Sequence, residues 1–232
     1  MLVIDATLMA SLANAGNFSV TPLDVQFSQQ QRSAVLTVAN DDNKPLTLRV
    51  RAMRWTQDAT GNDQYQESSD LIFFPRRLNL NPADKRIIRV GVNATGAEES
   101  AYRLFIDEVP QVQAGGAQSK LAVLVSFGIP IFITPAEAKG ELTIKLASVA
   151  EDGQLVLQVA NSGGSRVRIS RLVNERGDLL SESLTSRYVF PGIAKEYHIA
   201  PQQPICGQAP TNLRLETDRG TSEVAVTPAQ RC

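Results

Sequence analysis

Residues 120–135 read KLAVLVSFGIPIFITP. Every second residue from position 121 to position 129 is large and apolar: Leu121, Val123, Val125, Phe127 and Ile129. This period of two predicts a β-strand with one strongly apolar face. The alternative is a plain core strand buried on both faces, but Ser126 and Gly128 on the opposite face would fill a core poorly. One face of this strand is therefore more apolar than the sheet of a soluble protein usually needs.

Apolar and polar residues also alternate with a period of two in the rest of the chain, whereas helical periodicity is almost absent. The first half contains seven candidate strands: 18–27, 33–39, 46–55, 71–74, 86–93, 102–109 and 121–134. That number is typical of an immunoglobulin-like sandwich. The pattern restarts after the short segment 134–140, which is neither Ser-rich nor charged enough to be a flexible tether. We predict an all-β protein with two immunoglobulin-like β-sandwich domains, 16–135 and 140–232, set at an angle.

The composition and the N-terminal residues limit the classes of partner and the cellular compartment that we expect. The chain has 232 residues and a formal net charge of −1 with no basic block, so nucleic acid is an unexpected partner. Residues 1–15 resemble a secretory signal that ends in the small-x-small cleavage pattern of Ala13, Asn14 and Ala15. This signal is imperfect, because Asp5 interrupts it and no Lys or Arg precedes Asp5. No other stretch is apolar for the roughly 20 residues of a membrane span, so we expect no membrane insertion.

The residues that carry chemistry are few. His198 is the single histidine, and Cys206 and Cys232 are the two cysteines, so we expect no metal site and no cofactor. In an exported protein the two cysteines are expected to form one disulfide. Asp107 and Glu108 are adjacent on a strand and point to opposite faces, which is wrong for an acid–base pair. We therefore predict no catalytic residues and no enzyme activity.

Six segments occur in an order and spacing that match a known family. They are TPL (21–23), SAVLTVAN (33–40), FP (74–75), RV (89–90), YRLFIDEVP (102–110) and IFITP (131–135). Together they resemble the periplasmic pilus (fimbrial) chaperones of the chaperone–usher pathway. The resemblance covers about residues 18–140, and the second domain is similar by its pattern alone. The run Ile129-Pro130-Ile131-Phe132 looks more like the archaic (sigma-type) branch.

The resemblance implies a function for the apolar strand. Pilus subunits of that family are sandwiches that lack their last strand, and the chaperone donates its own strand to the open groove, a form of β-strand addition. Carried onto this chain, the donor residues are Leu121, Val123, Val125, Phe127 and Ile129. The implied partners are pilus subunits and an outer-membrane usher, and the implied compartment is the periplasm. We expect the free protein to cover its apolar strand by self-association or by disorder of the loop around residues 111–119.

The resemblance is incomplete at the site that anchors the subunit's terminal carboxylate. Well-known members use an arginine and a lysine, and this chain has Asp24 and Pro130 at those places. A carboxylate in the cleft between the domains still requires a cation. The candidates are Arg89, Arg103 and Lys120, and for each the alternative is an ordinary solvated charge.

Two other classes of protein compete with the chaperone. A secreted two-domain adhesion or pilus-structural protein would carry a disordered, alternating extension at its mature N-terminus, but Gly16 leads directly into the first strand. A generic binding module would use its loops, of which 56–70 is the longest candidate. Co-purification with a small sandwich subunit in a 1:1 complex distinguishes the chaperone from both.

Overall fold

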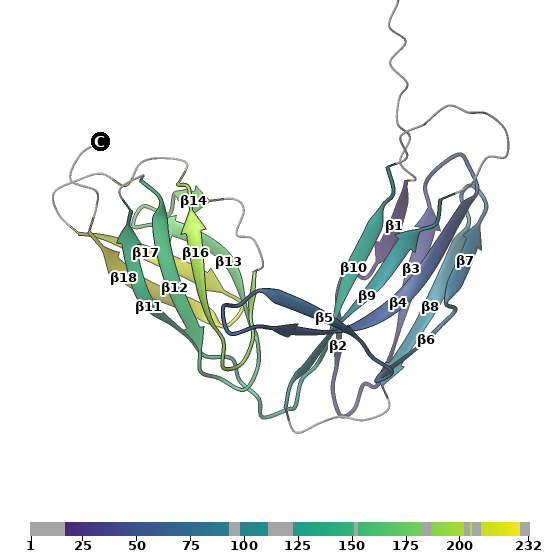
Figure 1. The fold of residues 1–232 in the computed structure, drawn as a ribbon, viewed down its shortest axis with the longest axis horizontal. Helices are drawn as coiled ribbons and strands as arrows, with labels where there is room; N and C mark the ends of the chain where they lie inside the picture. The colour runs from purple at the N-terminus through teal and green to yellow at the C-terminus, as the bar shows by residue number, and fades with distance from the viewer. Residues whose placement is uncertain are drawn as a thin grey trace, which may run out of the picture.

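A computed structural model of the chain describes residues 17–92, 98–110, 123–150, 153–181, 187–201, 205 and 210–227. Every regular element in these residues is a β-strand, as predicted, and they form two sandwiches that enclose an angle (Figure 1). No helix in the described residues is long and apolar enough to cross a membrane. The predicted signal segment 1–15, two of the predicted binding residues and both cysteines lie outside the described residues: Lys120, Leu121, Cys206 and Cys232.

The N-terminal sandwich consists of two sheets. Sheet A contains four strands in the order β1 (Phe18–Thr21), β3 (Ser33–Asn40), β8 (Lys85–Val92) and β6 (Leu71–Phe74). Sheet B contains β2 (Val25–Phe27), β10 (Ser126–Ile133), β9 (Ser100–Glu108), β4 (Leu46–Gln57) and β5 (Asp63–Glu67), and β7 (Arg77–Leu80) also pairs with β4. Alternate apolar residues of both sheets point inward and form one core, including Leu36, Leu48, Ile88 and Leu104.

The first predicted strand, 18–27, is divided between the two sheets. β1 pairs antiparallel with β3 in sheet A, whereas β2 pairs parallel with residues 131–133 of β10 in sheet B. Pro22 lies at the crossing, after a cis peptide bond, and it has no N–H to contribute to a ladder. The chain therefore leaves one sheet and joins the other within three residues.

The C-terminal sandwich repeats the two-layer plan. One sheet contains β11 (Leu142–Val149), β12 (Leu155–Asn161) and β16 (Ala194–Ile199). The other contains β14 (Leu179–Ser181), β13 (Val167–Asn174), β17 (Thr211–Thr217) and β18 (Gly220–Val226), with β15 (Tyr188–Val189) paired to β13. Its core is separate from that of the N-terminal sandwich and includes Leu157, Ile169 and Leu215.

Candidate functional site

More than half of β10, residues 126–130 of Ser126–Ile133, has an unpaired edge in the described part of the chain. β9 pairs with all eight residues of β10. On the other side, β2 pairs only with residues 131–133. Residues 126–130 therefore have a strand neighbour on one side alone among the described residues, on the flank of the domain that faces the C-terminal sandwich (Figure 1).

Main-chain groups of this segment point to the unpaired edge. The Glu108 N–H donates to the Val125 carbonyl oxygen at 2.9 Å, and on the opposite side the Thr134 N–H donates to Phe27 O at 3.2 Å. Because hydrogen bonding alternates along a strand, odd-numbered residues of β10 bond to β9 and even-numbered residues point the other way. Ser126 and Gly128 therefore offer N–H and C=O groups at the edge. Such a row of unpaired groups is a template for an additional strand.

The predicted donor residues differ in how far they are buried. Val123 is 46% exposed, whereas Val125 and Phe127 are partly buried and pack against the N-terminal core. The Phe127 ring meets Phe18 of β1 edge to face, with the ring centroids 5.0 Å apart. Ile129 is 2% exposed and belongs to that core. The apolar face thus changes along the strand from exposed residues to core residues, and its role as a donor stays a prediction.

Arg103 of β9 lies beside this edge, on the cleft side of sheet B. Its guanidinium carbon is 4.1 Å from the ring centroid of Trp55 and 5.6 Å from that of Tyr65. Its Nε is buried without a hydrogen-bond partner, and none of the ion pairs among the described residues includes Arg103. Burial raises the pKa of Tyr65, and the charge of Arg103 opposes that rise. Arg103 is therefore a cation held by aromatic rings rather than by a carboxylate.

Gly128 explains how Arg103 reaches this position. A Cβ atom added to Gly128 would lie 2.9 Å from Arg103 Cδ and 3.3 Å from the Phe105 ring. The absence of a side chain at position 128 therefore lets the arginine lie across β10.

We expect Gly128→Ala to displace Arg103 from Trp55, because its methyl group occupies the path of the arginine side chain. The fluorescence of Trp55, the single tryptophan, measures this displacement. Ser126→Ala is the matched control, since it adds no atom to the same face of β10. Identical spectra for Gly128→Ala and wild type would contradict the steric role of Gly128.

The structure does not bring the described candidate cations together. Arg89 is exposed on the outer face of sheet A, whereas Arg103 is in sheet B. Arg51 was not among the cations predicted from the sequence. Its Nε donates to Asp107 Oδ2 at 2.8 Å on the face of β9 next to β10. Burial alone would raise the pKa of Asp107, but hydrogen bonds from Arg51 and Ser126 outweigh it and lower that pKa. Arg51 is therefore already neutralised, unlike Arg103.

An aromatic cluster joins the two sandwiches below this edge. Trp55, Ala101 and Phe132 of the N-terminal sandwich pack with Phe190 of the C-terminal one, and the Trp55 and Phe190 ring centroids are 4.8 Å apart. The Gln57 amide bridges the same boundary, because it donates to Tyr188 O at 2.9 Å and accepts from the Phe190 N–H at 3.0 Å.

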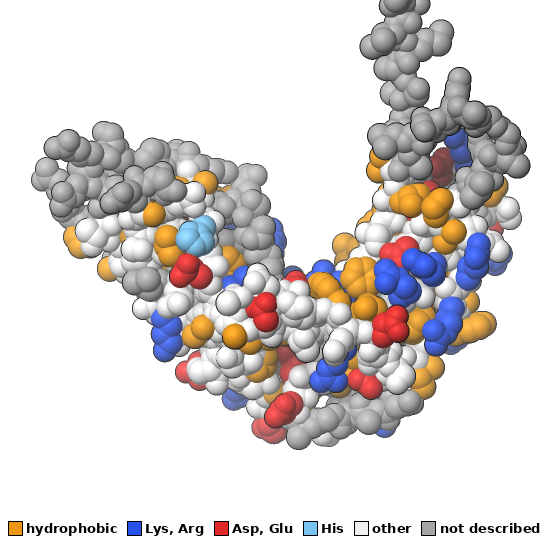
Figure 2. Space-filling model, viewed as in Figure 1, with side chains coloured by type: hydrophobic (Ala, Val, Ile, Leu, Met, Phe, Trp, Pro, Cys, Tyr) orange, Lys and Arg blue, Asp and Glu red, His pale blue; other side chains and the backbone are white. Residues whose placement is uncertain are grey.

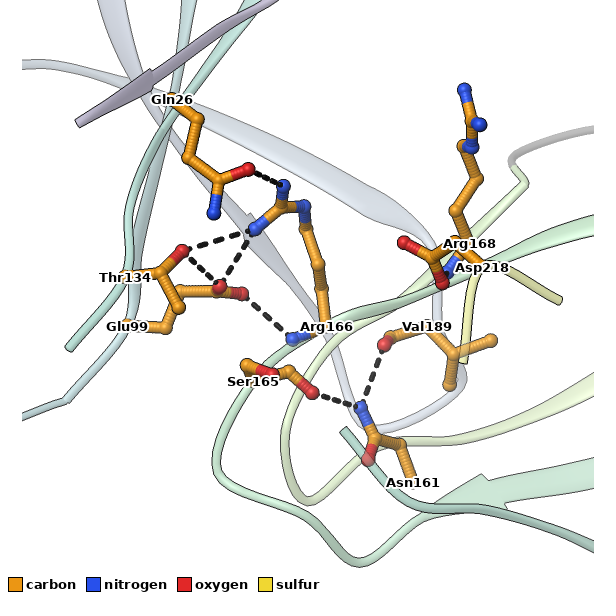
Figure 3. A network of polar contacts seen from close by, with 9 residues as sticks. All are labelled: Gln26, Glu99, Thr134, Asn161, Ser165, Arg166, Arg168, Val189 and Asp218. Atoms are coloured by element: carbon orange, nitrogen blue, oxygen red, sulfur yellow. Dashed lines mark hydrogen bonds and ion pairs between the residues drawn. The ribbon is translucent and has the colours of Figure 1, made fainter. Parts of the chain in front are cut away.

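A buried ion pair also crosses the boundary (Figure 3). Arg166 Nη1 is 2.7 Å from Glu99 Oε2, and the two side chains are 7% and 2% exposed. The Arg166 backbone N–H donates to the other carboxylate oxygen at 2.7 Å, and Thr134 Oγ1 donates to Oε2 at 2.7 Å. Burial lowers the pKa of Arg166, and the Glu99 carboxylate opposes that shift. Asn161 supports the loop before Arg166 by donating to the carbonyl oxygens of Ser165 and Val189.

The β4–β5 hairpin adds a third contact between the sandwiches (Figure 1). Lys195 Nζ of β16 donates to Gly61 O in the hairpin turn at 2.8 Å, and the lysine is 8% exposed. Neither β5 nor this contact was predicted from the sequence. With the aromatic cluster and the ion pair, the hairpin fixes the angle of the concave surface that the two sandwiches form (Figure 2).

Comparison with solved structures shows the same fold in pilus chaperone systems. A chain of the CsuC–CsuE chaperone–tip adhesion subunit pre-assembly complex, from archaic chaperone–usher Csu pili of Acinetobacter baumannii, matches with a TM-score of 0.61 and 18% identity, covering 92% of this chain and 100% of that one. A chain of the Salmonella enterica SafA pilin–SafB chaperone complex gives 0.61 and 16%, covering 93% and 98%. The Pseudomonas aeruginosa CupB2 chaperone gives 0.54 and 18%, covering 89% and 98%.

Comparison of the sequence with known protein families identifies the family as well as the fold. The chain has no significant match among curated proteins. The model of the pili and flagellar-assembly chaperone family, PapD N-terminal domain, matches residues 17–139 and therefore more than half of the chain. This match confirms the resemblance stated from the sequence: the protein belongs to the pili and flagellar-assembly chaperones and is a pilus chaperone.

Proposed function

We propose that this chaperone captures a pilus subunit along the unpaired edge of β10, in the periplasm, and delivers it to an outer-membrane usher. The observation that carries the proposal is the edge itself. Residues 126–130 have no second strand neighbour among the described residues, and exposed Val123 and partly buried Val125 and Phe127 lie at or beside it. Backbone groups there supply hydrogen bonds to a partner strand, and alternate side chains supply selectivity.

The same proposal includes Arg103 as the anchor of the subunit's terminal carboxylate. Arg103 lies beside the edge, has no carboxylate partner among the described residues and is held on Trp55. A guanidinium in such a site binds a carboxylate by charge-assisted hydrogen bonds. The sequence Ile129-Pro130-Ile131-Phe132 favours membership of the archaic branch, in which we place this chain.

Co-expression tests capture directly. We expect the tagged chaperone to retain a small secreted sandwich protein encoded beside it in a 1:1 complex. The Ser126 and Gly128 amides should become protected from hydrogen exchange in that complex, because a partner strand accepts hydrogen bonds from them. Purification without any such subunit, or a complex in which these amides exchange freely, would contradict strand addition at this edge.

We expect Arg103→Ala to weaken subunit binding by roughly 10- to 100-fold, because a hydrogen bond to a charged group contributes about 1.5–3 kcal/mol. Arg89→Ala removes the same charge from the outer face of sheet A and serves as the control. Calorimetric titration should also show that amidating the C-terminus of a subunit peptide removes the difference between wild type and Arg103→Ala. A penalty that survives amidation would show that Arg103 does not bind the carboxylate.

A further inference from the structure

A cavity of about 540 Å³ is lined by residues of both sandwiches. The N-terminal sandwich contributes the last residues of β4 and the first of β9, and the C-terminal sandwich contributes residues 163–164 and 190–193. None of the described residues that line this interdomain cavity belongs to β10. Its volume is that of a small-molecule site, and such sites often lie at domain boundaries.

The wall of the cavity around Trp55 is apolar but holds an N–H group that lacks an acceptor. Ala101, Phe190, Pro191 and Ile193 line the cavity together with Trp55. Trp55 Nε1 is buried and has no hydrogen-bond partner among the described residues. A buried indole N–H usually has such a partner. A ligand in this cavity can therefore supply both an apolar surface and an acceptor oxygen.

The charged residues that line the cavity leave one carboxylate unpaired. Arg54 Nη1 lies 3.4 Å from Asp70 Oδ2, and Glu99 Oε2 lies 2.7 Å from Arg166 Nη1. Glu98 is exposed and takes part in none of the ion pairs among the described residues. The other lining charges are thus already matched, so the cavity favours a ligand that brings a cation to Glu98.

We propose that the interdomain cavity binds a small amphiphilic amine, a molecule with an apolar body, a carbonyl oxygen and a protonated amino group. The apolar body packs against Phe190 and Ile193, the carbonyl oxygen accepts from Trp55 Nε1, and the ammonium group pairs with Glu98. Because this ligand contacts both sandwiches, its binding stabilises them in their fixed arrangement. The site is separate from the β10 edge, so the inference does not depend on subunit capture.

The test uses the whole purified chain and, as the probe, naphthylalaninamide, which has a large aromatic body, one carbonyl group and one amine. Trp55 is the single tryptophan, so its indole N–H gives one signal in a proton–nitrogen correlation NMR spectrum. We expect millimolar probe to move this signal downfield and to raise the melting temperature. The N-acetyl derivative keeps the ring and the carbonyl but has no charge, and it should bind about tenfold more weakly.

Two variants locate the probe. Glu98→Gln should lower its affinity about tenfold in calorimetry, because the amide carries no charge. Glu137→Gln makes the same change at an exposed position outside the cavity and should bind the probe like wild type. Thr56→Phe puts an aromatic ring at an exposed lining position and should abolish the downfield shift, while its melting temperature without probe shows whether the fold is intact.

Three results would overturn the inference. An indole signal that the probe leaves unchanged would show that no ligand of this class reaches Trp55. A shift of full size in both Glu98→Gln and Thr56→Phe would place the probe outside the cavity. Equal affinity for the probe and its N-acetyl derivative would show that the site does not select an amine. None of these results bears on subunit capture, which all three variants should retain at wild-type affinity.

Discussion

Val123→Glu should abolish subunit capture and leave the free chaperone folded. Val123 is 46% exposed in the free protein, so a glutamate there reaches water. In the complex the same carboxylate would enter an apolar groove without a partner, which costs several kcal/mol. We expect affinity to fall more than about 100-fold, since each 1.4 kcal/mol is a factor of ten. Calorimetry of binding, together with thermal melting of the free protein, measures both effects.

Ile129→Glu in β10 is the matched control further along the predicted donor segment. Ile129 is 2% exposed and belongs to the core of the N-terminal sandwich, so this glutamate should unfold that sandwich without any partner. The donor-strand proposal requires the two substitutions to behave differently. A drop of tens of degrees in the melting temperature of Val123→Glu would show instead that Val123 is a core residue.

Arg166→Met should release the two sandwiches from their fixed angle. It leaves the Glu99 carboxylate buried at 2% exposure without its cation, and breaking a buried pair from one side typically costs about 3–5 kcal/mol. Small-angle X-ray scattering should show a broader distribution of interdomain distances than in wild type. Subunit capture should weaken as well, because Arg103 lies beside the aromatic cluster that Phe190 completes.

Two further variants test whether loss of the Arg166 charge causes the expected loss of stability and the wider range of interdomain distances. Arg171→Met breaks an exposed pair with Glu216 and should change stability by no more than about 1 kcal/mol. The double variant Arg166→Met, Glu99→Gln removes both charges and should recover part of the lost stability. Wild-type scattering from Arg166→Met would mean that the aromatic cluster and the β4–β5 hairpin hold the angle alone.

Local sequence patterns were sufficient for the fold class, although they did not predict β5 or β7. The alternation in segments such as 33–39 and 102–109 gives both the strand and its buried face, because burial in a sandwich follows the same period of two. The predicted strand 18–27 was wrong in one respect, since it is divided at Pro22 between two sheets. Alternation continues across that division and does not reveal which strand each half joins.

Less of the candidate site than of the fold was predicted from the sequence, because the site is formed by contacts between residues that are far apart in the sequence. Arg103 was one of several candidate cations, and nothing local shows that Gly128 leaves room for it or that Trp55 holds it. Glu99 and Arg166 are 67 residues apart, and neither lies in a motif that we used. The interdomain cavity is likewise lined by residues of both sandwiches, and no local pattern indicates that these residues meet.

The neighbouring strands already hold the backbone of β10 in the free protein. The conformational entropy of this strand is therefore lost when the domain folds and not when a subunit binds. β9 holds all eight of its residues, β2 holds the last three, and Phe132 is locked in the aromatic cluster. Residues 126–130 are therefore already extended before any partner arrives. Fixing five backbone residues removes roughly 5–10 kcal/mol of conformational freedom, at about 1–2 kcal/mol each. That loss occurs when the domain folds, so a disordered peptide with the same residues should bind the same subunit far more weakly.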